Sequence, residues 1–294
     1  MKKLKIVFVG LLIAVTVFQI ACKKGNSDAI SLNLTESKTK TELALINAKY
    51  QRETSNNTAS RWWSLREICN VFVQDVGGAW AGSWAGGKVG VLVGGPGGAG
   101  AGAVVGAVVV GAAASYSATP HNRNRISTNR SVPLSTIDIN FTLDNPENNP
   151  YDELVGKRHN LLLMDNLIKN EGSTSTDINY LYSRCSLTIN ESIFLANDSG
   201  MTSNVFSAIS ETNSLDNIKE LLQIKISDPQ LVLIMSSYID GISTISSLDN
   251  AIKLSYEYEK YVKSCISLTE YQKQILLEGL SVSKYSNQFW QRVL

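Results

Sequence analysis

The chain has 294 residues, of which 18% are charged and 44% are hydrophobic. Lys and Arg number 27 against 26 Asp and Glu, and the net charge of +1 predicts no basic surface for nucleic acid. Because His121 and His159 are the only histidines, a zinc or iron site with several histidine ligands is excluded. We therefore expect no nucleic-acid partner, no metal and no cofactor.

The first 22 residues have the layout of a bacterial export signal. Three lysines precede an uncharged run of 15 residues, Ile6 to Ile20, which is short for a membrane span. The end of this run, Gln19-Ile20-Ala21-Cys22, resembles a lipobox of the loose form seen in Bacteroidetes-type lipoproteins. The resemblance implies cleavage after residue 21 and a lipid on Cys22, which would anchor the protein in the cell envelope, at the outer membrane. An ordinary signal peptide with an incidental cysteine is the alternative.

Composition and periodicity divide the chain into five segments. They are a lipoprotein signal peptide at 1–21, a polar tether with one short helix at 22–60, a Gly-rich helical hairpin at 61–118, a polar connector at 119–149 and an all-helical domain at 150–294. The helix of the tether is expected at 41–52, and one strand is expected in the connector at 135–143, with Ile137, Ile139 and Phe141 on one face. The helices expected in the last segment are 152–169, 177–182, 201–210, 215–224, 230–246, 248–264 and 269–290. The predicted fold class is mainly α, a hairpin plus a C-terminal bundle.

Glycine is concentrated in one segment: fourteen of the 21 glycines lie between Gly77 and Gly111. Within it, eight glycines follow one another at a spacing of four, which places them on one face of a helix and lets another backbone approach closely. In water each helical glycine costs about 1 kcal/mol relative to alanine, whereas in a membrane small residues drive helix packing. The eight are Gly78, Gly82, Gly86, Gly90, Gly94, Gly98, Gly102 and Gly106.

The run from Gly94 to Gly98 contains Pro96 and predicts a turn between two helices, 62–93 and 99–118. Twenty residues rise about 30 Å, enough to cross a bilayer core. The first helix carries four of the five tryptophans, Trp62, Trp63, Trp80 and Trp84, and tryptophan prefers the membrane interface. Lys88 is the only charged residue of this helix after Asp75.

This segment resembles the glycine-zipper two-helix segments of outer-membrane lipoproteins of the surface-antigen type. It is also similar to the small-residue helices of two-peptide bacteriocins. Both resemblances imply association with a lipid membrane or with a second copy of the chain. The alternative is a soluble hairpin buried against the C-terminal domain.

A polar motif opens the last segment, with Asn149-Pro150-Tyr151-Asp152 followed by Gly156 and His159-Asn160. Asp152, Gly156, His159 and Asn160 share one helix face, which favours a hydrogen-bonded structural role. The motif and the aromatic C-terminus around Phe289-Trp290 are similar to those of Bacteroidetes-type lipoproteins that have Gly-rich segments and no established activity. Acid–base chemistry by His159 with Asp152 is the alternative, but no nucleophile elbow accompanies these residues.

We therefore expect a non-enzymatic envelope lipoprotein whose hairpin associates with membrane or self-oligomerises. The alternatives are a bacteriocin-like toxin that inserts into membranes and a hydrolase centred on His159. Beyond Cys22 the chain has three cysteines, Cys69, Cys185 and Cys265, at spacings that match no metal or redox motif. A disulfide between Cys185 and Cys265 or buried free thiols are both compatible with this pattern.

Overall fold

The computed structural model describes residues 36–51, 65–118, 133–144, 146–169, 178–185 and 215–293, with a few single positions between 191 and 208. The signal peptide, Cys22, Trp62 and Trp63 lie outside the described residues. Within the described part, helices dominate and the one pairing of extended backbone is an isolated bridge between Gln51 and Ile245. The predicted mainly α fold class is confirmed.

The chain divides into two compact units, Met1–Leu45 and Ile46–Leu294. The short helix predicted at 41–52 is found at 36–48. The second unit holds both the Gly-rich segment and the C-terminal helices. The hairpin and the segment at 150–294, which the sequence divides, thus belong to one body.

The Gly-rich segment is a helical hairpin, α2 (Leu65–Ala118), with its turn where Pro96 predicts it. Gly95 interrupts the helix with φ 62° and ψ −154°, a conformation that only glycine adopts readily. Proline follows at once and cannot continue the first arm, because its ring clashes with the preceding turn.

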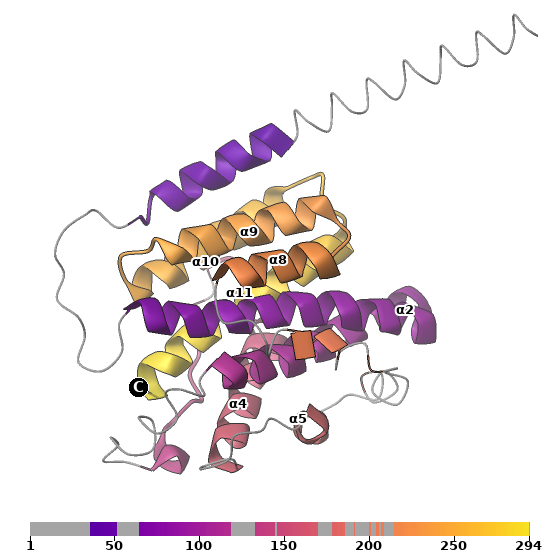
Figure 1. The fold of residues 1–294 in the computed structure, drawn as a ribbon, viewed down its shortest axis with the longest axis vertical. Coiled ribbons are helices and arrows are strands. Elements are labelled where there is room, and N and C mark those ends of the chain that lie inside the picture. The colour runs from indigo at the N-terminus through magenta and orange to yellow at the C-terminus, as the bar shows by residue number, and fades with distance from the viewer. Residues whose placement is uncertain are drawn as a thin grey trace, which may run out of the picture. The chain divides into compact units, whose positions relative to one another are not determined.

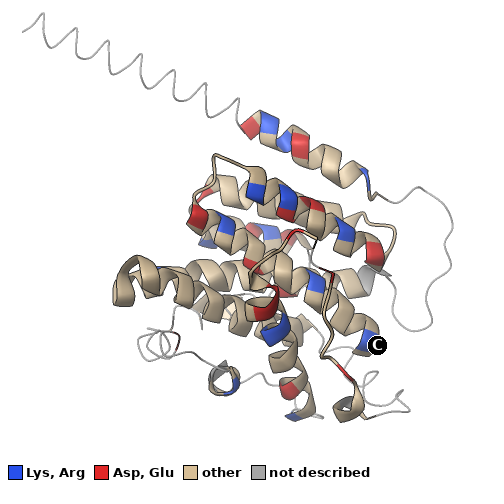
Figure 2. Ribbon diagram, turned by 180° about the vertical axis from the view of Figure 1, so that it is seen from behind, with Lys and Arg blue, Asp and Glu red and all other residues tan. Residues whose placement is uncertain are grey.

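The hairpin lies between two groups of helices (Figure 1). One group contains α8, α9 and α10, the other contains α4 and α5, and α11 makes the broadest contact with α2. Figure 2 shows α2 almost free of charged residues, whereas charges are frequent along α8 and α10. The bounds are α4 Arg158–Lys169, α5 Ile178–Arg184, α8 Leu215–Lys225, α9 Pro229–Ser243, α10 Leu248–Ser264 and α11 Glu270–Val293.

Two helix starts follow the capping rules that the sequence indicates. The Asp228 carboxylate accepts from the backbone N–H groups of Gln230 and Leu231 at 3.0 and 3.1 Å, and Pro229 occupies the first turn of α9. Before α11, the Thr269 hydroxyl accepts from the Gln272 N–H, and the Gln272 side chain accepts from the Thr269 N–H.

The helix predicted at 152–169 begins differently: a π-helical turn, η2 (Asp152–Lys157), precedes α4. Of the helix predicted at 201–210, only scattered positions fall within the described residues.

The strand predicted at 135–143 is wrong. This region contains a 3-10 turn, η1 (Leu134–Thr136), followed by irregular backbone. The alternation of side chains is real, since Ile139 and Phe141 are both buried. Phe141 stacks on Tyr285 of α11 with ring centroids 5.6 Å apart. The segment lies along a helix, and a helix offers no ladder of free backbone groups to pair with a strand.

Candidate functional site

The glycines of the hairpin pack its two arms against each other, backbone to backbone. A Cβ on Gly82 would overlap the carbonyl oxygen of Gly106, and one on Gly86 would overlap the carbonyl oxygen of Gly102. The same holds for Gly90 and the carbonyl of Gly98. The predicted close approach along this face is therefore present, and its partner is the other arm of the same hairpin.

Gly78 and Gly94 depart from this backbone-to-backbone pattern. Gly78 faces the other arm where Ala114 stands, and an added Cβ would lie 2.6 Å from the Ala114 Cβ. Gly94 lies at the turn, where an added Cβ would meet nothing within 4 Å. Seven of the eight predicted packing glycines thus lie on the inner face of the hairpin, and Gly94 does not.

The outer faces of the hairpin are covered by the surrounding helices. Trp80 is fully buried, lies against Gly279 of α11 and donates its indole N–H to the Leu276 carbonyl at 3.2 Å. Gly77 lies against Ile218 of α8. By length and composition residues 68–116 could cross a membrane, but 78% of their most apolar window is buried within the protein. Trp80, expected at a membrane interface, is a core residue because its indole fills the space that Gly279 leaves open.

The closed end of the hairpin is apolar and exposed. Val91, Leu92 and Val93 have 49%, 82% and 37% of their surface accessible. Glycines and Pro96 form the rest of this end, and an added Cβ on Gly94, Gly95 or Gly97 would meet nothing within 4 Å. In Figure 1 this end of α2 projects beyond the neighbouring helices.

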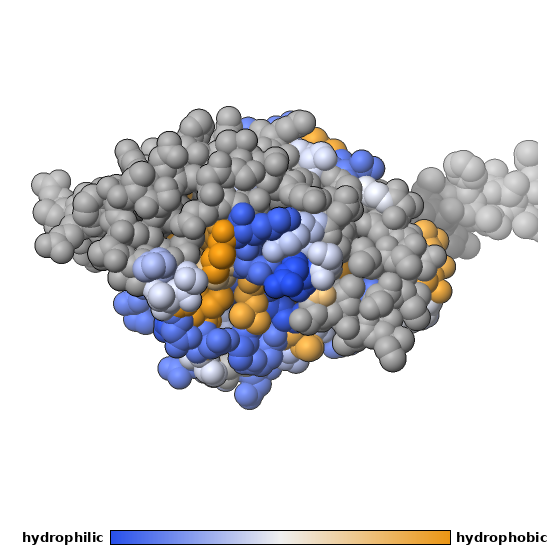
Figure 3. Space-filling view, turned by 90° about the horizontal axis from the view of Figure 1, so that it is seen from below, coloured by the Kyte–Doolittle hydropathy of each residue, from blue (hydrophilic) through white to orange (hydrophobic). Residues whose placement is uncertain are grey.

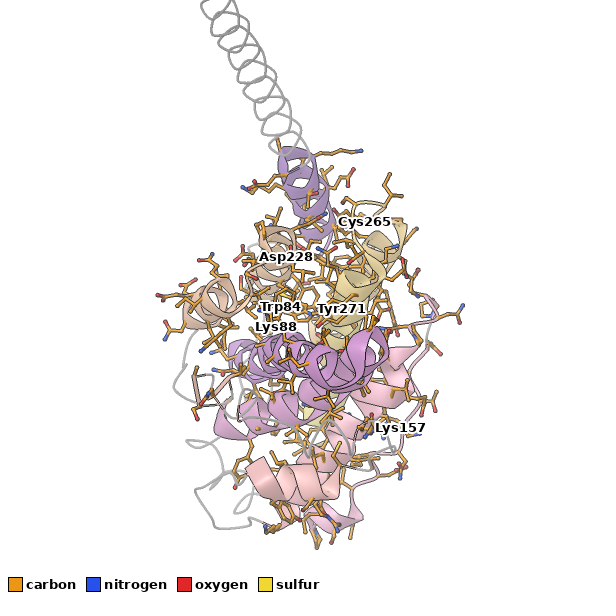
Figure 4. The ribbon with its side chains drawn as sticks, turned by 90° about the vertical axis from the view of Figure 1, so that its right-hand side faces the viewer. Trp84, Lys88, Lys157, Asp228, Cys265 and Tyr271 are labelled. Carbon is orange, nitrogen blue, oxygen red and sulfur yellow. The ribbon has the colours of Figure 1, made fainter. Side chains whose placement is uncertain are left out.

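Three amphipathic side chains lie just behind this end, and we call them the collar: Trp84, Lys88 and Tyr271 (Figure 4). The ammonium of Lys88, which is exposed, lies 4.6 Å from the centre of the Trp84 ring, a cation–π contact. The Tyr271 hydroxyl lies against Gly87, where any Cβ would collide with it. The Trp84 indole nitrogen and the Tyr271 hydroxyl have no hydrogen-bond partner among the described residues.

The motif that opens the C-terminal segment docks α11. Asp152 is buried and its carboxylate meets the ammonium of Lys284 at 2.8 Å. Lys284 also meets Glu259 of α10 at 2.8 Å, and the Asn149 amide donates to the same carboxylate at 2.7 Å. Burial raises the pKa of Glu259, against the opposing effect of the Lys284 charge. One buried cation thus joins two carboxylates from different helices.

The other motif residues make close contacts with the same helix. The Tyr151 carbonyl accepts from Ser281 at 3.0 Å, and Asn160 donates to the Tyr285 carbonyl at 2.8 Å. A Cβ on Gly156 would lie 2.5 Å from the Ser281 hydroxyl, so glycine is required where η2 crosses α11.

His159 is fully buried and lies against Gly111 of the hairpin. Its Nδ1 is 3.1 Å from the Asn160 side-chain oxygen, and burial lowers its pKa to about 4. Asp152, the acid–base partner that helix spacing suggested, is paired with Lys284 instead. The imidazole is neutral at pH 7 and has no solvent-facing surface from which to act on a dissolved substrate.

Two further carboxyl groups lie inside the contact between α2 and α11. Asp75 of the hairpin accepts from Ser286 and from the Trp290 indole, and burial raises its pKa to about 7. Glu278 of α11 accepts from Ser83 at 2.6 Å and from Gln274 at 2.7 Å, and burial raises its pKa to about 8. The most apolar segment of the chain is therefore held in the bundle partly by polar groups.

A cavity of about 210 Å³ lies beside α4 and α5. Figure 3 shows the molecule from below relative to Figure 1, and hydrophobic and strongly hydrophilic residues are intermixed among the residues that it colours. Both arginines of the cavity are paired: Arg158 with Glu191 at 2.8 Å, and Arg184 with Asp165 at 2.9 Å. The cavity therefore offers no uncompensated guanidinium for an anion.

The three cysteines that the structure describes, Cys69, Cys185 and Cys265, are free thiols. No group of three metal-ligating side chains occurs within the described ranges. The comparisons with known proteins found no matching family model, no similar curated protein and no similar solved structure.

The sequence pattern indicates the glycines and the motif, but not the charged residues of α11 that meet the motif and the hairpin. Glu278 and Lys284 lie six residues apart on a helix whose apolar positions otherwise predict its buried face. A charged residue within such a face is the signal that could have revealed them.

Proposed function

We propose that this protein is a non-enzymatic, lipid-anchored lipoprotein of the bacterial cell envelope, and that the hairpin α2 is its membrane-contacting element. The observation that carries the proposal is the closed end of the hairpin, where Val91, Leu92 and Val93 are exposed together. The lipobox-like sequence at Cys22 supports the anchor. Large apolar residues grouped at a projecting end favour contact with an apolar phase.

The packing of the hairpin favours contact with lipid over self-association along the glycine face. That face is occupied, because Gly82, Gly86 and Gly90 each meet the backbone of the other arm. A second copy could reach these glycines only if the arms separated. The exposed end is accessible without any such opening.

Cell fractionation tests the proposal. The native chain should sediment with membranes, and Cys22→Ser should release most of it if the lipid is the principal anchor. Carbonate extraction of the Cys22→Ser chain then measures what the hairpin contributes. If the native chain and the Cys22→Ser chain are both found entirely in the soluble fraction, the proposal is wrong.

A bacteriocin-like toxin is the second candidate. The burial of the hairpin by the amphipathic helices around it favours this candidate. Most of the apolar window of α2 is buried, so a water-soluble body carries a segment long enough to cross a bilayer. Rapid release of dye from lipid vesicles by the full chain would support it. Intact vesicles at saturating protein would exclude it.

The surroundings of His159 support a function without catalysis. The imidazole is enclosed between α4 and the hairpin, and Asp152 is engaged by Lys284. A hydrolase centred on this residue would need both groups at a surface. The residues of the motif have a structural role, since they join η2 and α4 to α11.

A further inference from the structure

We propose that the hairpin docks on a lipid surface by its tip and the collar behind it, while the helical bundle stays closed. The tip is Val91–Gly97, and the collar behind it is Trp84, Lys88 and Tyr271. This inference rests on the proposed function and states how the contact is made. The partner is the surface of a phospholipid bilayer that contains anionic lipid.

The tip has the composition of a shallow insertion element. Three large apolar side chains and a run of glycines with Pro96 occupy it, and no charged residue follows Lys88 within the hairpin. Leu92 is 82% exposed, so transfer into the acyl region removes surface that now faces water. The arms behind the tip are already buried against protein and gain nothing of this kind.

The collar has the composition of an interfacial belt. Trp and Tyr favour the headgroup level, and a lysine ammonium meets phosphate there. The Trp84 indole nitrogen and the Tyr271 hydroxyl are enclosed and have no hydrogen-bond partner within the part of the chain that the structure describes. A side-chain rotation toward a headgroup oxygen would therefore add a hydrogen bond without breaking one.

The contact between α2 and α11 argues against release of the whole hairpin. Withdrawal of α2 would separate Trp80 from Gly279 and the Leu276 carbonyl, and Asp75 from Ser286. It would also carry the Asp75 carboxyl toward the bilayer. Tip docking leaves these contacts in place.

Tip docking also fits an anchored protein. The lipid that the proposed function places on Cys22 attaches the chain to the membrane, and the apolar tip adds a second, weaker contact. The tip would then set the orientation of the bundle on the membrane.

Vesicle flotation tests the tip directly. The chain from residue 22 onward, the expected exported form, carries Cys22→Ser so that it has no lipid. It is mixed with vesicles of phosphatidylcholine and phosphatidylglycerol. We expect Leu92→Asp to weaken binding about tenfold or more, because a leucine that would insert into the bilayer is replaced by a charge. Lys88→Gln should weaken binding about fivefold on vesicles with anionic lipid and little on pure phosphatidylcholine.

The matched control is Ile266→Asp, since Ile266 is 99% exposed and lies between α10 and α11. It makes the same kind of change outside the tip and the collar and should leave vesicle binding unchanged. Equal losses for Leu92→Asp and Ile266→Asp would overturn the tip as the docking surface.

A disulfide staple separates tip docking from release of the hairpin. A Cβ on Gly77 would lie 3.9 Å from the Ile218 Cβ, which suits a disulfide between Gly77→Cys and Ile218→Cys. The three natural cysteines of the described chain are replaced by alanine. We expect the oxidised, stapled protein to bind vesicles as well as its reduced form.

The outcomes are distinguishable. Binding that is lost on oxidation and restored on reduction overturns tip docking but leaves the hairpin as the membrane-contacting element. Absence of binding in the unstapled parent chain overturns tip docking and the hairpin as the membrane-contacting element. It leaves the lipid anchor on Cys22, which fractionation of the native chain tests separately. If the stapled chain does not fold, as judged by circular dichroism, Leu92→Asp against Ile266→Asp decides, because both positions are exposed.

Discussion

The inner face of the hairpin and the buried face of α11 fill the same interior in opposite ways. The hairpin has glycines on this face, so that the carbonyls of Gly102 and Gly106 lie against the facing backbone. The α11 face inserts charges, with Lys284 between Asp152 and Glu259. The first contact depends on shape alone and tolerates no added atom. The second depends on partners and tolerates no missing one.

Enlarging the glycine face should give the largest effect. We expect Gly86→Leu to destabilise the fold by more than about 3 kcal/mol, because the new side chain would overlap the Gly102 backbone. Urea unfolding followed by circular dichroism measures it. Gly97→Ala is the matched control, since nothing lies within 4 Å of its Cβ, and it should change stability by about 0.5 kcal/mol or less. Equal effects would refute backbone-to-backbone packing.

Removing the central cation should break the other interface. We expect Lys284→Ala to cost about 3–5 kcal/mol, because Asp152 and Glu259 would stay buried without their partner. Lys157→Ala, which removes an exposed pair with Glu153, should cost about 0.5 kcal/mol or less. Denaturant midpoints of the two variants give the comparison. A small loss of stability for Lys284→Ala would mean that Asp152 and Glu259 are uncharged in the folded protein.

Raising the pH should weaken the contact between α2 and α11. Burial raises the pKa of Asp75 to about 7 and that of Glu278 to about 8, so both carboxyls bind protons more tightly in the folded protein than in the unfolded one. Their destabilising effect is absent below the ordinary carboxyl pKa. Stability falls as the pH rises from there to about 7 for Asp75 and to about 8 for Glu278, and it is level above. His159 acts in the opposite sense, since its pKa is lowered to about 4 and its stabilising effect is lost below pH 6.5.

The variant Glu278→Gln isolates one of these groups. It should be more stable than the native chain at pH 9, by on the order of 2 kcal/mol, and nearly equal to it at pH 4. Unfolding at both pH values measures the difference. A constant difference between the two pH values would show that the Glu278 carboxyl does not titrate in this range.

The smallest expected effect lies outside both interfaces. Asp228→Ala removes the side chain that caps α9 and should cost about 1 kcal/mol. Asp228→Asn should retain most of that stability, since its amide oxygen accepts the same bonds. Thermal unfolding compares the two, and equal losses would assign the effect to charge instead of capping.

Local pattern determined most of the fold. The helix at 248–264 has the predicted bounds, because Ser247 caps it and its apolar residues keep one period. The glycine register and Pro96 determined a hairpin with its turn at 94–98. The prediction of a strand at 135–143 is wrong because alternating apolar residues indicate only that every second side chain is buried. It does not report whether a sheet or a helix covers them.

The sequence by itself determined that one face of α2 must meet another backbone, since glycines four residues apart can do little else on a helix. Only the tertiary structure decided which backbone that is, because the same spacing suits the other arm, a second copy or a membrane partner. It likewise decided the surroundings of His159 and Lys284. Their partners come from helices distant in the chain, and helix spacing carries no record of contacts between elements.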